Sequence, residues 1–390
     1  MANRFIYLLT LIVISFRLLA NDIELKKVSI LTCGPGSNIY ELEGHTALRL
    51  QFTDGTDLTV NWGIFDFNSP NFLYRFVKGE TDYRMGIYPF SNFYNQYKYD
   101  GRELSERELY LTKEQKDRLC ELIDSTITKG SPIYRYNYIK DNCATRPVDY
   151  IEKAIGSPIT FGNITGLPES AKTFRQDMYY YHRQHPWYQF GIDLALGSDI
   201  DYILDHREHY FAPIALDNML ENASYTDSIG KQVRLAGPSQ TLLTSAQKES
   251  TTPFFLKPIF ISWLFFCITC IVCLYDIKRK KITLWFSSLY YFATGLAGLL
   301  LTFLIFISVH EATNPNWLYL WLNPFCFIGV IFIWLKKFNE IVFYWQIANF
   351  VALTVLLIIY AVNVQQLNHA FIPLIASDIL LSVLWLISSR

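Results

Sequence analysis

Five long apolar runs in the last third of the chain constrain its fold more than any other feature. Each run is close to or above the length of about 20 residues with which an α-helix crosses a lipid bilayer. Short polar segments separate the runs, so we expect separate spans. The runs cover roughly residues 255–275, 282–308, 317–335, 341–362 and 370–387. The sequence therefore predicts an all-α transmembrane bundle of five helices within residues 251–390.

The basic residues between these runs predict how the spans are oriented. Lys and Arg gather at positions 278–281, 336–337 and 390, whereas the loops around positions 310–316 and 363–369 contain neither. Loops rich in Lys and Arg stay on the cytoplasmic side of a membrane. We therefore expect the basic loops and the C-terminus inside, and the large segment that precedes the spans outside.

The start of the chain predicts the same orientation independently. Arg4 is followed by an apolar run from Phe5 to Phe16 that is too short for a comfortable span, and Ala20 offers a small residue at a cleavage point. This pattern is typical of a secretory signal peptide over residues 1–20. An uncleaved anchor is the alternative, and both lead to export of the following segment.

The exported segment, residues 21–253, is expected to fold as an α+β domain. The whole chain has 51% hydrophobic and 18% charged residues, which excludes a disordered protein. Its net charge of -1 argues against nucleic acid as a partner. β-Branched and alternating apolar residues predict strands over residues 27–33, 45–52 and 57–67.

Two helices are predicted after these strands. Thr112 and Gln115 have the spacing of a capping box, which opens the first helix. The second helix is predicted over residues 143–155 from the apolar residues on one of its faces. Residues 166–250 are expected to form a helical extension and linker, because residues 224–253 are rich in Ser, Thr, Gly and Gln.

The cysteines single out one candidate nucleophile. Four of the seven lie in predicted spans among large apolar residues, where packing explains them better than a metal site does. The other three are Cys33, Cys120 and Cys143, and an oxidising compartment can pair only two of them. Cys143 stands out because the polar pair Asp141-Asn142 precedes it directly at the predicted helix start.

This position favours a reactive thiol. With Asn142 or Asp141 as the N-cap, Cys143 lies in the first helical turn, close to unpaired backbone N–H groups and the positive end of the helix dipole. Both features lower the pKa of a thiol. The same N–H groups can stabilise an oxyanion. An unreactive buried cysteine at a helix start is the alternative.

A cysteine nucleophile needs a base, and His45 is the candidate. It begins a predicted strand directly after Gly44, so its ring projects from a rigid sheet edge. Asn61 on the next strand is predicted to lie beside the ring and to fix its tautomer, with Asp66 as the second choice for that role. A purely structural histidine is the alternative.

These motifs resemble a known arrangement. In the circularly permuted papain-like fold of the lecithin–retinol acyltransferase type, the His lies on an early strand and the Cys follows at a helix start, as His45 and Cys143 do here. The closer resemblance is to the alternative bacterial lipoprotein N-acyltransferase family, Lnb, and it covers nearly the whole mature chain. The motifs that carry it are residues 44–49 (GHTALR), 61–67 (NWGIFDF), 138–146 and 314–324.

The resemblance implies a thiol acyltransferase in the bacterial inner membrane. Its periplasmic papain-like domain would cover residues 21–165. The activity it implies is transfer of a fatty acyl chain from a phospholipid donor to the N-terminal α-amine of a diacylated lipoprotein, through a thioester on Cys143 with His45 as base and Asn61 as the third residue. It implies neither a cofactor nor a metal.

Four further residues are candidates for binding the substrate or an oxyanion. They are Asn142, Arg146, Asp66 and His310. His310 stands at the outer end of the second span, and ionisable residues at such places are frequently functional. An interfacial histidine in a polar loop is the alternative there.

Two other functions are compatible with the sequence. One is a membrane-anchored cysteine hydrolase, either a peptidase or a lipase, that uses the same Cys–His pair. The other is a non-enzymatic envelope scaffold, for which Cys143 would be dispensable. Product analysis separates transfer from hydrolysis, because transfer leaves the acyl group on an amine, whereas hydrolysis releases a free fatty acid or a cut peptide.

The predicted orientation is tested by labelling single introduced cysteines in intact cells with a membrane-impermeant reagent. Sites in the segment that precedes the spans should be labelled from outside, and sites at positions 278–281 should be labelled only after the cells are opened. Labelling of the 278–281 loop in intact cells would contradict the orientation.

Overall fold

The structure is a computed structural model that describes residues 23–168, 171–247 and 251–388. The chain divides into two compact units, each of which is built from several segments. The sheet unit contains residues up to 72, 81–168 and 204–248, and the membrane unit contains residues 73–80, 169–203 and 249–390. The predicted signal peptide, residues 1–20, lies outside the described residues.

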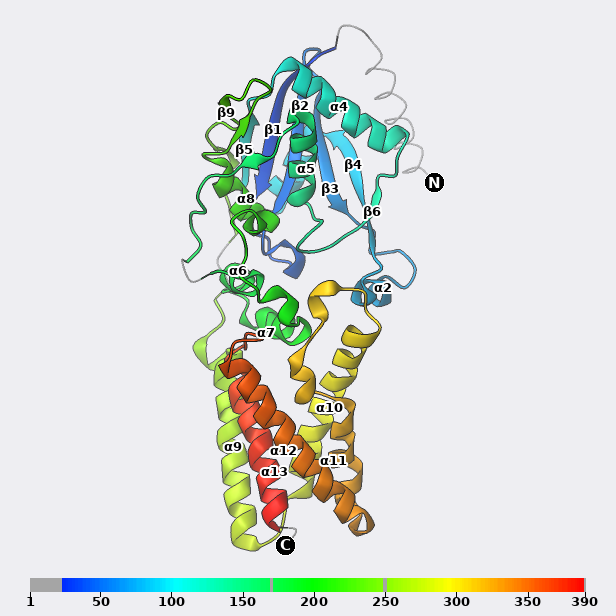
Figure 1. Cartoon of the computed structure of the whole chain (residues 1–390), viewed down its shortest axis with the longest axis vertical. Coiled ribbons are helices and arrows are strands. Elements are labelled where there is room, and N and C mark those ends of the chain that lie inside the picture. The colour runs from blue at the N-terminus through cyan, green and yellow to red at the C-terminus, as the bar shows by residue number, and fades with distance from the viewer. Residues whose placement is uncertain (1–22, 169–170, 248–250, 389–390) are drawn as a thin grey trace. The chain divides into compact units, whose positions relative to one another are not determined.

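A seven-stranded antiparallel sheet forms the centre of the sheet unit (Figure 1). Its strands lie in the order β10-β5-β1-β2-β3-β4-β6. The strands are β1 (Leu25–Cys33), β2 (His45–Phe52), β3 (Asp57–Ile64), β4 (Asp82–Pro89), β5 (Leu104–Leu109), β6 (Ile133–Arg135) and β10 (Gln240–Leu243). The three predicted strands are confirmed as β1, β2 and β3, each to within a few residues.

The end of the sheet unit differs from the prediction. Residues 224–243, expected to be part of a linker, hold three strands. One of them, β10, pairs with β5 at the edge of the large sheet. The others complete a small sheet of β7 (Ile159–Thr160), β8 (Ser224–Thr226) and β9 (Gln232–Arg234). The linker prediction was wrong because strands of three or four residues are too short to show an alternating pattern.

Helices cover both faces of the large sheet. Side chains alternate between the two faces of a strand. Val28 and Leu48 point toward α4, α5 and α8, whereas Leu31 and Ala47, each an odd number of residues away on the same strand, point toward α3. Figure 1 shows α5 lying in front of β2 and β3. The helices are α3 (Phe90–Tyr99), α4 (Lys113–Thr128), α5 (Thr145–Ile155) and α8 (Pro213–Leu220).

The predicted start of α4 is confirmed. The Thr112 hydroxyl oxygen accepts from the Gln115 N–H at 3.3 Å, and Gln115 Oε1 accepts from the Thr112 N–H at 2.9 Å. These two bonds satisfy backbone donors that a helix start otherwise leaves unpaired.

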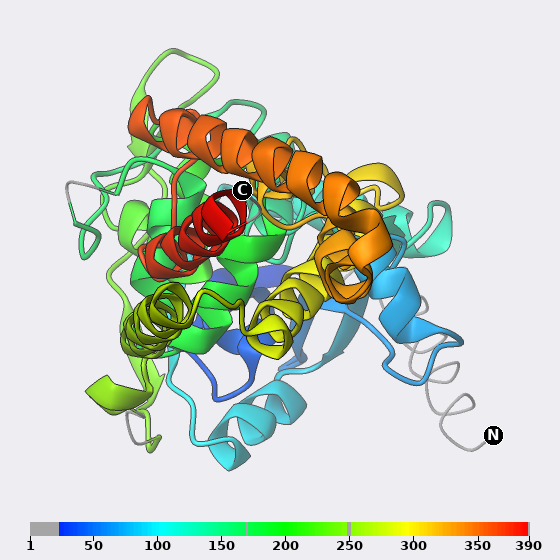
Figure 2. The ribbon, with the colours of Figure 1, turned by 90° about the horizontal axis from the view of Figure 1, so that it is seen from below.

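Five segments of the described chain are long and apolar enough to cross a membrane, as predicted. They are Pro258–Arg279, Leu284–Phe306, Glu311–Trp334, Lys336–Ala361 and Phe371–Ser388. Four of them hold a long helix each: α9 (Pro258–Arg279), α10 (Leu284–Phe306), α12 (Asn339–Ala361) and α13 (Phe371–Ser388). Figure 2 shows α13 lying between α9 and α12, and it packs against both.

The third span consists of short helical pieces, among them α11 (Ile328–Ile331). Two asparagines restart the helix: Asn316 Oδ1 accepts from the Leu318 N–H at 3.1 Å, and Asn323 Oδ1 accepts from the Phe325 N–H at 3.1 Å. Pro324 lacks the N–H that a continuous helix needs. The apolar length predicted a span here, and these caps decide that the span is interrupted.

Two segments outside the spans belong to the membrane unit. The helix α2 (Phe72–Lys78) comes between β3 and β4 in the chain, and its Tyr74 ring packs against Phe303 of α10 with 5.9 Å between the centroids. The helices α6 (Phe174–Tyr181) and α7 (Pro186–Ala195) lie in the predicted extension. Residues 166–250 are therefore divided between the two units.

A buried arginine ties the α6–α7 segment to a loop between two spans. Arg175 is 4% exposed and donates to Asp201 at 2.7 Å and to Asp193 at 3.0 Å. Asp201 also accepts from the backbone N–H of Gln366 at 3.0 Å, and Asp193 accepts from Asn368 Nδ2 at 2.8 Å. Buried charges are tolerated when they are paired and hydrogen-bonded, so this network fixes the segment on the membrane unit.

Arg175→Ala should destabilise the membrane unit, because it leaves two buried carboxylates without their cation. Breaking a buried ion pair on one side typically costs about 3–5 kcal/mol. We expect the thermal midpoint in detergent, followed by tryptophan fluorescence, to fall by about 6 °C or more. The exposed Arg183, which donates to the Tyr180 carbonyl, is the control. Equal midpoints for Arg175→Ala, Arg183→Ala and the unmodified chain would contradict the assignment.

Candidate active site

Cys143 lies at the start of α5. The regular helix begins at Thr145 with Ala144 at its N-cap position, two residues later than predicted. The hydrogen bonding begins earlier, because the Arg146 N–H bonds to the Asn142 carbonyl at 3.1 Å. Asn142 Oδ1 accepts from the N–H groups of Ala144 at 2.8 Å and Thr145 at 3.0 Å, which is the pattern of an N-cap side chain. Cys143 therefore lies in the first turn.

Burial decides the protonation of this thiol. Cys143 is 7% exposed, and burial raises the pKa of its thiol to about 11. Hydrogen bonds from the backbone of Thr46 and from the Tyr136 hydroxyl lower the pKa, and the Glu43 carboxylate raises it. The expectation of a lowered pKa was wrong, because the loss of hydration outweighs the favourable helix start.

His45, the first residue of β2, is hydrogen-bonded to Asn61 of β3. Nε2 of the ring lies 2.6 Å from Asn61 Oδ1. An amide oxygen can only accept, so Nε2 carries the proton and Nδ1 keeps its lone pair. Asn61 Nδ2 donates in turn to the Tyr88 hydroxyl at 2.7 Å. Burial lowers the pKa of His45 to about 4, and Arg102 adds to this while Asn61 opposes it.

The two candidate residues come together around Gly63. A Cβ atom at Gly63 would lie 3.7 Å from Cys143 Cβ, 3.7 Å from Tyr136 Cε2 and 4.0 Å from His45 Cε1. Gly63 has a φ of 86°, and the register of β3 against β4 shifts at this point. Such bulges interrupt strand pairing and redirect side chains next to active sites. The absence of a side chain here leaves room for a reacting group.

Tyr136 is a site residue that the sequence analysis missed. Its ring stacks on Tyr83 with 4.2 Å between centroids, and its hydroxyl is hydrogen-bonded to Cys143. Burial raises the pKa of Tyr136 well above its ordinary value, so the hydroxyl keeps its proton and can donate. Tyr136 comes directly after β6 in the chain. One tyrosine in an aromatic segment carries no signal that could have identified it.

Asn142 and Arg146 support the turn that carries Cys143. Asn142 Nδ2 donates to the carbonyls of Tyr138 at 2.7 Å and Phe211 at 2.9 Å, so both ends of its amide are engaged. Arg146 is ion-paired with Asp141, and its guanidinium lies 4.0 Å from the centre of the Tyr134 ring. Both residues therefore brace the turn. The N–H groups bound by Asn142 are those that the sequence analysis assigned to an oxyanion.

Asp66 and His310 are hydrogen-bonded to other parts of the chain. Asp66 is exposed, and its Oδ1 accepts from the Asn68 N–H at 2.9 Å, as is typical of a turn. His310 belongs to the membrane unit, where its Nε2 is 2.8 Å from the Phe76 carbonyl oxygen and holds α2. Asn61, and not Asp66, is the residue beside His45.

The other two cysteines of the sheet unit, Cys33 and Cys120, are buried or partly buried, and neither forms a disulfide with any described cysteine. Burial raises the pKa of Cys33 and of Cys120 to about 12. Cys33 ends β1, where it is the cross-strand partner of His45, and Cys120 lies within α4, so neither has the helix start and the preceding asparagine of Cys143. We keep the prediction that neither is catalytic.

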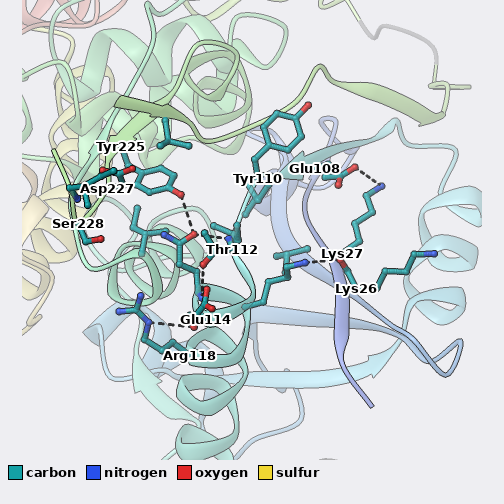
Figure 3. A pocket seen from close by; sticks show the side chains of 18 residues that line it. Lys26, Lys27, Glu108, Tyr110, Thr112, Glu114, Arg118, Tyr225, Asp227 and Ser228 are labelled. Atoms are coloured by element: carbon teal, nitrogen blue, oxygen red, sulfur yellow. Dashed lines mark hydrogen bonds and ion pairs between the residues drawn. The ribbon is translucent and has the colours of Figure 1, made fainter. Parts of the chain in front are cut away.

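An open pocket of about 770 Å³ lies in another part of the sheet unit. Figure 3 shows it between the start of α4, β1 and the β8–β9 hairpin. Lys26, Arg118, Glu114 and Asp227 are among its lining residues, so charges of both signs are present. Neither Cys143 nor its neighbours line this pocket.

Two family models match this chain. One, described as the Lnb N-terminal periplasmic domain, matches residues 17–171, and the other, described as the Lnb transmembrane domain, matches residues 248–390. The chain belongs to the Lnb family. As an Lnb protein it is a multi-pass membrane protein with a periplasmic N-terminal domain, in a family that acts in lipoprotein N-acylation. No curated protein and no solved structure matches the chain.

The pH dependence of Cys143 alkylation tests its protonation state in this Lnb protein. With a thiol pKa of about 11, the thiolate fraction should rise about tenfold per pH unit between pH 7 and 10. The rate of iodoacetamide labelling, quantified on the Cys143 peptide by mass spectrometry, should rise with it. A rate that is constant from pH 6 to 9 would show a thiolate–imidazolium pair instead.

Proposed function

We propose that this protein is a lipoprotein N-acyltransferase that carries the acyl group as a thioester on Cys143. The observation that supports the proposal most strongly is the arrangement around Gly63, where Cβ of Cys143 and the ring of His45 lie next to a position without a side chain. Membership of the Lnb family supplies the class of substrates, namely a phospholipid acyl donor and a diacylated lipoprotein.

The first half-reaction forms the thioester. Sγ of Cys143 attacks the ester carbonyl of the phospholipid while Nδ1 of His45 takes the thiol proton. Both groups start uncharged, so the proton moves as the S–C bond forms, which is general-base catalysis. The C–O bond of the ester then breaks, and the same proton passes from His45 to the oxygen of the departing lysophospholipid.

The second half-reaction regenerates the thiol. The α-amine of the lipoprotein attacks the thioester carbonyl, an amide bond forms and the S–C bond breaks. The proton lost by the amine returns to Sγ by way of His45. Two successive half-reactions of this kind give ping-pong kinetics.

Three donors support the oxyanion in each half-reaction. They are the backbone N–H groups of Thr46 and Cys143 and the hydroxyl of Tyr136, which are hydrogen-bonded to the thiol before the reaction and lie beside the carbon that Sγ attacks. Preorganised donors of this kind are frequently the largest single contribution to acyl transfer. The N–H groups of Ala144 and Thr145 are not assigned this role, because they already donate to Asn142 Oδ1.

Substitution of the two central residues tests the proposal. Cys143→Ala removes the nucleophile and His45→Ala removes the base, and loss of general-base help alone costs about 10²–10⁴-fold in rate. Because the two residues act as a unit, the double variant should be little slower than either single variant. The measurements are triacylated lipoprotein formed and a hydroxylamine-labile acyl mass on the intact protein.

Cys120→Ser serves as the matched control, because it removes another thiol of the sheet unit, one that lies within α4 and not beside His45. It should keep both the acyl adduct and the transfer. Triacylation at the unmodified rate by Cys143→Ala would contradict the thioester mechanism. Release of free fatty acid without any acylated amine would favour the hydrolase.

A further inference from the structure

A connected series of aromatic rings leads from the surface of the sheet unit to Cys143. At the outer end, Tyr40 is 58% exposed and Phe67 is 56% exposed. Both rings contact Phe65, with centroid distances of 6.0 Å and 4.5 Å. Large exposed rings that lie together cost free energy in water and commonly mark a place where an apolar partner binds.

The inner part of the series reaches the thiol. The Phe65 ring lies 5.1 Å from the ring of Tyr83, which is 8% exposed, and Tyr83 stacks on Tyr136 at 4.2 Å. The hydroxyl of Tyr136 is hydrogen-bonded to Cys143. Apolar surface is therefore continuous from the exposed rings to the buried nucleophile.

The covalent chain links the outer end to the membrane unit. Phe72 lies 5.1 Å from the Phe67 ring and 5.9 Å from the Phe65 ring. The residue bonded to it, Leu73, is 73% exposed and already belongs to the membrane unit. Phe72 is thus joined by one peptide bond to a unit with five spans, and we therefore assign bilayer hydrocarbon as the apolar partner of the exposed rings.

We propose that these rings form an aromatic track along which an acyl chain of a bilayer phospholipid lies while its ester reaches Cys143. The track consists of Tyr40, Phe65, Phe67, Phe72, Tyr83 and Tyr136. The proposal rests on the thioester function and adds the route of the donor. An acyl chain on the track also covers the rings and excludes water, which protects a thioester from hydrolysis.

The test uses the full chain in nanodiscs of ether phospholipids, which contain no ester to donate. Two donors are compared: a palmitoyl ester phospholipid placed in the nanodisc, and water-soluble dihexanoyl phosphatidylcholine below its micelle concentration. The variant is Phe67→Asp, which puts a charge at the outer end of the track. The readout is the initial rate of acyl mass added to Cys143, with thermal unfolding as a check on folding.

Phe67→Asp should slow acylation by the long-chain donor by at least about tenfold, since apolar burial of one ring is worth that much. Acylation by the dihexanoyl donor should stay within about twofold, because short chains need little of the track. Tyr99→Asp also replaces an aromatic ring by a carboxylate, at a 92% exposed position outside the track, and should leave both rates unchanged. If Phe67→Asp does not fold, Tyr40→Asp takes its place.

The failures of the two proposals differ. If Phe67→Asp keeps the full rate of acylation by the long-chain donor, or slows acylation by both donors equally, the aromatic track is wrong and the thioester mechanism still stands. If neither donor acylates Cys143 of the unmodified chain, the proposed thioester function is wrong.

Discussion

The removal of water from a thiol and an imidazole is the constraint on which the rest of the site depends. Burial raises the pKa of Cys143 to about 11 and lowers the pKa of His45 to about 4, so the pair is uncharged at neutral pH. An uncharged pair needs its base in one tautomer, with the lone pair at Nδ1. The hydrogen bond from Nε2 to Asn61, whose amide is held by Tyr88, fixes that tautomer.

Two local devices bring this pair together. The Asn142 side chain holds the turn before α5 through four hydrogen bonds, two accepted by Oδ1 and two donated by Nδ2. At Gly63, a positive φ and a register shift end the regular pairing of β3 with β4. A side chain at Gly63 would occupy the space around which Cys143, His45 and Tyr136 meet.

Two segments of the membrane unit interrupt the sheet unit in the sequence. The chain leaves the sheet unit between β3 and β4 to form most of α2, and leaves it again for the α6–α7 segment. His310 holds the first of these segments and Arg175 fixes the second. The strand that carries both Asn61 and Gly63, β3, is the last strand before α2 in the chain.

The sequence by itself determined the features that depend on local pattern. Apolar length gave the five spans, the Thr112–Gln115 spacing gave the start of α4, and alternation gave the central strands, because each signal lies within one element. It also singled out His45, Asn61 and Cys143 as candidates, since each occupies a distinctive position at or near an element's end. Short strands such as β10 lacked a comparable signal, and the apolar length of the third span did not reveal the caps that Asn316 and Asn323 form within it.

Only the tertiary structure decided how these groups behave. The helix start at Cys143 suggests a lowered thiol pKa, but desolvation is a property of the whole environment and reverses the sign. The same holds for Tyr136 and Tyr88, which gain their roles from neighbours distant in the sequence. The sequence motif makes Asn142 and Arg146 candidates for binding the substrate, but in the structure both are bonded to other groups of the protein. The partners of a polar side chain depend on how the whole chain folds, so the motif could not reveal them.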